Sequence, residues 1–140
     1  MSGLLLLKNL KRRMLIYLDT NILIRYLTRD IESQAQKAKS LIESENVIFI
    51  PDVVFPEVAY ILISQYESNR NEVVDALTSI VNRDNVKCNE YILWALSLYE
   101  KTKNDIADCI IVAQSLENLS QLATFDKVLF KIEDVIPFKF

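Results

Sequence analysis

The stretch Leu15-Ile-Tyr-Leu-Asp-Thr-Asn-Ile-Leu-Ile24 determines how the fold begins. Leu15 to Leu18 is a short apolar run that ends at Asp19, and a helical pattern starts at Ile22 after two polar residues. An apolar run of this length, followed by polar residues and then a periodic segment, predicts a strand, a turn and a helix. We therefore expect an acidic side chain at the end of the first strand.

Strand and helix patterns alternate along the rest of the chain. Strands are predicted at 47–50, 86–88 and 121–125, with a last edge strand over 135–138 that Pro137 breaks; helices are predicted at about 33–42, 56–66, 71–81, 91–99 and 105–119. Short apolar strands between longer helices are typical of a parallel sheet covered on both faces. The fold class predicted is α/β, a three-layer α/β/α sandwich with a central, mainly parallel sheet.

The length of 140 residues and the 51% hydrophobic content suit a single domain. We expect that domain to span residues 14–140, because no internal repeat or Pro/Gly-rich linker divides it. Residues 1–13 are expected to be an N-terminal extension, with Met14 as an alternative natural start. The four basic residues of this extension would contact phosphate groups or form a solvated tail, and we favour the tail because charge runs are usually solvated. They are Lys8, Lys11, Arg12 and Arg13.

Rare residue types exclude several kinds of chemistry. The absence of histidine excludes Ser-His-Asp triads and H-E-x-x-H zinc sites, and a single glycine excludes phosphate-binding glycine loops. Cys88 and Cys109 have no C-x-x-C spacing, so we expect buried, reduced thiols in a cytoplasmic protein. No apolar run approaches the roughly 20 residues that cross a membrane. Carboxylates, amides, hydroxyls and basic side chains remain for function.

Four acids occupy positions where an α/β fold places ligands. Asp19 and Asp126 directly follow predicted strands, whereas Glu57 and Asp108 lie in the first turns of predicted helices. Ligands of open parallel sheets bind at the carboxyl ends of the strands. The placement predicts an acidic site there.

Asp108 is the most informative of these acids, because apolar residues surround it almost completely. Asp105 precedes it by three residues and so shares its helix face. Burying several carboxylates together is unfavourable unless a cation neutralises them, and an all-oxygen set suits Mg²⁺ or Mn²⁺. Such a site can activate a water molecule for phosphodiester hydrolysis.

Each acid also has an ordinary structural explanation. Asp19 could begin a turn, Glu57 could interact with a helix dipole, Asp105 could cap a helix, and Asp126 could start a type I turn. The functional interpretation therefore depends on their joint placement.

In order along the chain, four motifs resemble those of the PIN-domain nucleases, and most closely the VapC-type toxins of prokaryotic toxin-antitoxin pairs. The motifs are Asp19-Thr20-Asn21, Pro56-Glu57-Val58, the run from Asp105 to Ala113, and Ala123-Thr124-Phe125-Asp126. The resemblance covers about residues 14–130. It departs from the family where a glycine usually precedes the last motif, so the turn there must use Asn118 or another geometry.

The resemblance implies an endoribonuclease that uses Mg²⁺ or Mn²⁺ to cleave RNA, is often a homodimer, and is neutralised by a small antitoxin protein. It implies that Asp19, Glu57, Asp108 and Asp126 are the catalytic metal ligands, with Thr20, Asn21, Asp105 and Thr124 in supporting positions. Arg25 and Lys127, next to the motifs, are candidate phosphate contacts, with surface solvation as the ordinary explanation.

Two other functions stay open at this point. One is a non-catalytic PIN-like scaffold that binds RNA or a protein. The other is a phospho-accepting signalling domain, which would also place acids at strand ends. The helix directly after Asp19-Thr20-Asn21 argues against the latter, and the complete set of acids argues against the former.

Overall fold

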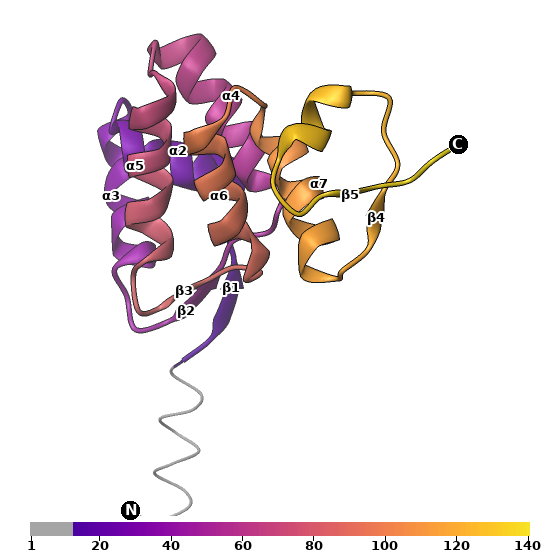
Figure 1. Ribbon diagram of the computed structural model, residues 1–140. Helices are drawn as coiled ribbons and strands as arrows, with labels where there is room; N and C mark the ends of the chain where they lie inside the picture. The colour runs from indigo at the N-terminus through magenta and orange to yellow at the C-terminus, as the bar shows by residue number, and fades with distance from the viewer. Residues whose placement is uncertain (1–12) are drawn as a thin grey trace, which may run out of the picture.

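The opening stretch forms the strand, turn and helix that its pattern predicts. The computed structural model describes residues 13–140, with β1 at Leu15–Tyr17 and α2 at Thr20–Thr28 (Figure 1). Asp19 is the N-cap residue of α2, and its backbone is extended. Apart from Arg13, the predicted N-terminal extension lies outside the described residues.

Helices and strands alternate along the chain, so the predicted α/β class is confirmed. The remaining elements are α3 (Glu32–Ile42), β2 (Val47–Phe49), α4 (Val54–Tyr66), α5 (Arg70–Val81), β3 (Val86–Lys87), α6 (Tyr91–Lys101), α7 (Ile106–Glu117), β4 (Gln121–Leu122), the 3₁₀ helix η1 (Lys127–Lys131) and β5 (Ile136–Pro137). Figure 1 shows α2, α3, α5 and α6 grouped above the first three strands, with the C-terminal segment beyond α7.

All strand pairs are parallel, but the strands form two sheets. β1, β2 and β3 pair in that order, with Ile16 opposite Ile48 and Ile48 opposite Val86. β4 and β5 form a separate pair. The predicted strand 121–125 ends at Leu122 because the chain turns: the Asp126 N–H donates to the Thr124 hydroxyl at 3.0 Å.

Two hydrophobic clusters stabilise these parts. The larger one joins the first sheet to helices α2 to α7, and Phe55, Leu77 and Val58 are fully buried in it. The smaller cluster attaches the C-terminal segment to α7. Its buried members are Val112, Leu116, Leu122 and Leu129. Since full burial of a large aliphatic side chain stabilises by about 1.5–3 kcal/mol, this small cluster is a modest anchor.

Some predicted helix ends were wrong. Neither Asp30 nor Ser33, the two polar residues at the start of the helix predicted at about 33–42, caps it: the N-cap residue of α3 is Ile31. Asp30 accepts hydrogen bonds from Arg25, Thr28 and Tyr66 instead.

The helix around Pro56 also starts earlier than predicted. α4 begins at Val54, so Pro56 is its third residue and not its first. The missing N–H is tolerated there because the first four N–H groups of a helix have no intrahelical partner. Glu57 still lies in the first turn, as predicted.

The turn after α7 uses Leu119 and not Asn118. Leu119 has a φ of 51°, in the left-handed region, whereas Asn118 has a φ of −88°. The N–H of Ser120 donates to the carbonyl of Ser115 at 2.9 Å, which closes the helix end. An apolar residue therefore replaces the glycine that such a turn favours.

Neither cysteine forms a disulfide: Cys109 is buried and Cys88 is half-buried. Across residues 13–140, no helix combines the length and the apolar character needed to cross a membrane.

Candidate functional site

The first group of candidate residues joins the N-termini of α2 and α4. Thr20, only 5% exposed, donates a hydrogen bond from its hydroxyl to the Glu57 carboxylate. Asp19, at the N-cap, is exposed, and its side chain makes no capping hydrogen bond. Both carboxylates therefore face solvent at helix N-termini, where the dipoles favour negative charge.

The second group lies at the N-termini of α7 and η1. Asp105 is the N-cap residue of α7, and its Oδ1 accepts from the backbone N–H of Asp108 at 3.1 Å. Asp126 caps η1 in the same way, accepting from the N–H of Val128 at 3.1 Å. The capping role foreseen as the ordinary explanation of Asp105 is thus real, whereas Asp126, expected at the start of a type I turn, caps η1. Each leaves one carboxylate oxygen for another partner.

In this group, Asp108 is the residue whose negative charge is unfavourable. Desolvation by partial burial, and then the negative charges of Asp105 and Asp126, raise the pKa of Asp108 above its ordinary value. The prediction that its apolar neighbours would partly bury it is confirmed. Asp126 contributes to this shift although 18 residues separate it from Asp108 in the sequence. A bound cation would relieve this repulsion.

The contacts described above connect the four principal acids in two pairs. Asp19 and Glu57 are on the α2–α4 side, and Asp108 and Asp126 are on the α7–η1 side with Asp105. Within residues 13–140, no group of three or more acidic or cysteine side chains has the geometry to hold a metal ion.

The residues predicted to assist these acids have varied surroundings. Thr20 contacts Glu57 and not Asp19, so its expected orienting role applies to the other carboxylate. Asn21 is exposed in the first turn of α2. Thr124 supports the backbone of Asp126 and not its carboxylate, because its hydroxyl accepts from the Asp126 N–H.

The two candidate phosphate contacts differ from each other. Arg25 forms an ion pair with Asp30 at 3.2 Å and donates to Gln34 at 2.8 Å. Its charge is therefore compensated within its own segment. Lys127 is exposed at the start of η1, directly after Asp126.

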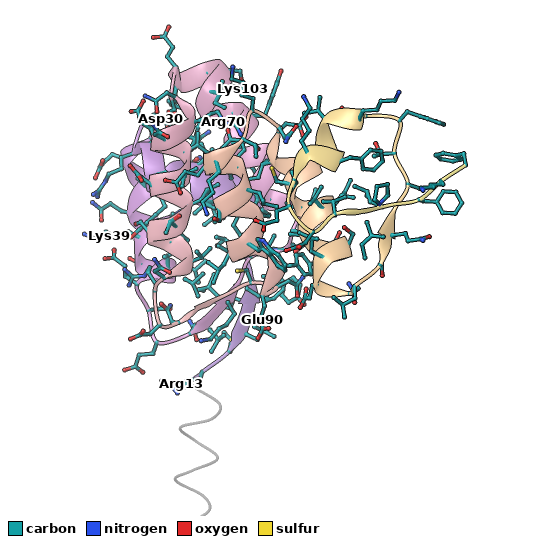
Figure 2. All side chains as sticks on the ribbon, in the orientation of Figure 1. Arg13, Asp30, Lys39, Arg70, Glu90 and Lys103 are labelled. Carbon is teal, nitrogen blue, oxygen red and sulfur yellow. The ribbon has the colours of Figure 1, made fainter. Side chains whose placement is uncertain are left out.

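Arg70 positions the loop that leads into Asp105, which the sequence did not reveal. Its guanidinium lies 3.6 Å from the centre of the Tyr99 ring, and Nη2 donates to the carbonyls of Tyr99 and Asn104 at 2.6 Å each. Arg70 is 29 positions from Tyr99 and 34 from Asn104 in the sequence, so no local motif could have identified the contact. Arg70 is the first residue of α5, and it is labelled in Figure 2 together with Lys103, which directly precedes Asn104.

Comparison with known proteins gives three findings. The PIN domain family model matches residues 16–135. A VapC ribonuclease from Aquifex aeolicus is 28% identical over 98 residues, which are 66% of this chain and 73% of that protein. A crystal structure of VapBC2 from Rickettsia felis, bound to a DNA fragment from its promoter, matches with a TM-score of 0.35 and 16% identity, and the match covers 89% of this chain and 97% of that chain.

Proposed function

The chain belongs to the PIN-domain family, and on that premise we propose that it is an endoribonuclease that uses Mg²⁺ or Mn²⁺ to hydrolyse phosphodiester bonds in RNA. The likeness to a VapC ribonuclease supports this activity. The observation that carries the proposal is the placement of Asp105 and Asp108 at the N-terminus of α7 and of Asp126 at the N-terminus of η1, where burial and the charges of Asp105 and Asp126 raise the pKa of Asp108.

The donor chemistry fits one or two hard divalent cations. Asp19, Glu57, Asp108 and Asp126 offer only carboxylate oxygens, which Mg²⁺ and Mn²⁺ prefer to softer ligands. When bound, such an ion lowers the pKa of a water molecule and stabilises negative charge on a phosphate. It would also reduce the repulsion at Asp108.

The protein's own groups would hold these acids in place. The hydroxyl of Thr20 orients Glu57, Asp105 fixes the first turn of α7 beneath Asp108, and Thr124 fixes the backbone of Asp126. We assign Lys127 to a substrate phosphate, because its ammonium group follows Asp126 directly at an exposed position. The RNA strand would therefore pass along the N-terminal ends of α7 and η1.

The activity is tested by incubating the purified full chain with single-stranded RNA and Mn²⁺ or Mg²⁺. Cleavage should require the metal, stop in excess chelator, and be lost in Asp108→Asn. Asp75→Asn is the matched control, because Asp75 is an exposed acid on α5 outside both groups. Cleavage that persists in Asp108→Asn or in chelator would disprove the assignment.

A second candidate function is a non-catalytic PIN-like scaffold that binds RNA or a protein. Within residues 13–140, no group of three or more acidic or cysteine side chains is arranged to hold a metal ion, and this favours the scaffold. Calorimetric titration with Mn²⁺ separates the two functions. Binding that disappears in Asp108→Asn supports the nuclease, whereas a scaffold would show no acid-dependent binding.

We further propose that the protein acts as the toxin of a toxin-antitoxin pair, with a small antitoxin protein as partner and a homodimer as the active form. The family supports these proposals. A short reading frame next to this one in the genome, whose product co-purifies with the chain and inhibits cleavage, is the expected result. Light scattering of the purified chain tests the dimer separately.

A further inference from the structure

One cavity in the described part of the chain lies outside the two acidic groups. It has a volume of about 580 Å³ and lies between α6, the loop that joins α6 to α7, and η1. Its charged and aromatic lining consists of Trp94, Lys101, Lys103, Lys131, Glu133 and Asp134. We call this cavity the lysine cleft. Its size is in the usual range for ligand pockets, about 300–1,000 Å³.

The lysine cleft attracts anions although the whole protein is acidic. Three lysines and two acids line it, whereas the chain has a net charge of −3. In residues 13–140, ion pairs join only Arg25 to Asp30 and Arg29 to Glu32. The three lysines of the cleft therefore have no carboxylate within ion-pair distance, and their charge is available to a ligand.

Trp94 adds an aromatic surface to this positive lining. It is the only tryptophan of the chain and is 43% exposed on α6, although an indole ring usually lies largely in the core. Sites for single-stranded nucleic acids combine cations that follow the backbone with aromatic rings on which bases stack. Trp94 and the three lysines form this combination in one cleft.

Both walls of the lysine cleft begin at candidate acids. Asn104, which lines the cleft, is followed directly by Asp105, and Arg70 holds the carbonyl of Asn104. η1, which carries Lys131, starts directly after Asp126. A strand that passes Asp108 and Asp126 can therefore continue along the chain's own elements into the cleft.

We propose that the lysine cleft binds the single-stranded segment of RNA next to the cleaved bond. Trp94 stacks on a base, and Lys101, Lys103 and Lys131 contact phosphates. This proposal rests on the proposed ribonuclease function, which makes the bound RNA strand the substrate. The proposed RNA site then includes the lysine cleft in addition to the metal ligands, and the cleft determines the position of the bound RNA.

The binding test uses the intact chain and a single-stranded oligouridylate in excess chelator, where the proposed metal-dependent cleavage does not occur. Because Trp94 is the only tryptophan, stacking should quench its fluorescence directly. Replacement of the three lysines by alanine should weaken binding about tenfold or more at 0.1 M salt and reduce the slope of log affinity against log salt by about 2. Lys39→Ala is the matched control, on the separate flank formed by α3 (Figure 2).

Variants of Trp94 test the stacking contact by anisotropy of a labelled probe. Trp94→Ala should weaken binding about 5- to 100-fold, and Trp94→Phe should restore most of that loss because a ring remains. Circular dichroism verifies that each variant is folded. If Trp94→Ala does not fold, the lysine variants and the fluorescence quenching of the wild type still decide the question.

The outcomes separate this proposal from the ribonuclease function. An unchanged salt slope in the triple variant, no quenching, or equal competition by polyglutamate would overturn the lysine cleft as an RNA subsite, even if cleavage persists. Competition by polyglutamate would indicate a site for acidic protein segments instead. Quenching with the expected salt slope, without RNA cleavage under any metal condition, would support the cleft and disprove the enzyme.

Discussion

The hydroxyl of Thr20 donates a hydrogen bond to the carboxylate of Glu57. This bond connects α2, which Asp19 caps, to α4, which carries Glu57. Thr20→Val keeps the side-chain shape but removes this donor. We expect stability to fall by about 1 kcal/mol, because Glu57 is exposed and water can replace the lost partner. RNA cleavage should need more Mn²⁺ than in the wild type. Thr20→Ser, which keeps the hydroxyl, should restore the metal requirement; if Thr20→Val has a wild-type metal requirement, the positioning role is wrong.

Asp108→Asn should make the metal-free protein more stable while it abolishes cleavage. The substitution removes a carboxylate that burial and the charges of Asp105 and Asp126 disfavour. Thermal unfolding in chelator should therefore give a higher Tm for the variant than for the wild type. Added Mn²⁺ should reverse the order, because only the wild type gains binding energy in the folded state. Asp75→Asn should show neither effect.

The stability contributed by Asp30 should decrease in acid. The hydrogen bond from Tyr66, at 2.5 Å, is the largest cause of a lowered pKa at Asp30, with Thr28 and Arg25 also contributing. A lowered pKa in the folded state stabilises the protein above the ordinary value of 3.8, and this stabilisation is lost as pH falls through the folded pKa. Urea unfolding should therefore show an advantage of wild type over Tyr66→Phe at pH 6. An advantage that does not shrink well below pH 3.8 would contradict this explanation.

Leu119→Gly should stabilise the fold by about 1 kcal/mol, because a left-handed backbone costs a residue with a side chain about 1–2 kcal/mol and glycine much less. Leu119 is 85% exposed, so the substitution removes little packing. Urea unfolding measures the gain. Asn118→Gly is the contrast: its φ is negative, so it should lower stability or leave it unchanged.

Arg70→Lys should lower stability by about 1–3 kcal/mol and reduce cleavage. Lysine cannot keep the planar contact with Tyr99 together with the two hydrogen bonds to the carbonyls of Tyr99 and Asn104. The loop before Asp105 should then become mobile, which hydrogen exchange of residues 102–106 would detect. Wild-type protection in this loop would show that Arg70 only stabilises the core.

The sequence predicted features that depend on near neighbours. The apolar flanks of Asp108 predicted its partial burial, and the three-residue spacing from Asp105 predicted a cap and a shared face. Features that depend on distant contacts were not predictable. Thr20 donates a hydrogen bond to Glu57, which is 37 residues away in the sequence. The strand after Ser120 is short because the chain turns where the Thr124 hydroxyl accepts a hydrogen bond from the N–H of Asp126. No residue pattern revealed that Leu119 would take the left-handed turn.

The small cluster of Val112, Leu116, Leu122 and Leu129 has a consequence for how activity would be lost. Asp126 belongs to a segment that this cluster attaches to α7, apart from the main core. Segments with few buried contacts open at a lower free energy than the whole domain. Local unfolding of the C-terminal segment would therefore remove Asp126 from Asp108 while the rest of the domain stays folded. Enzymatic activity should disappear at a lower denaturant concentration than helical structure.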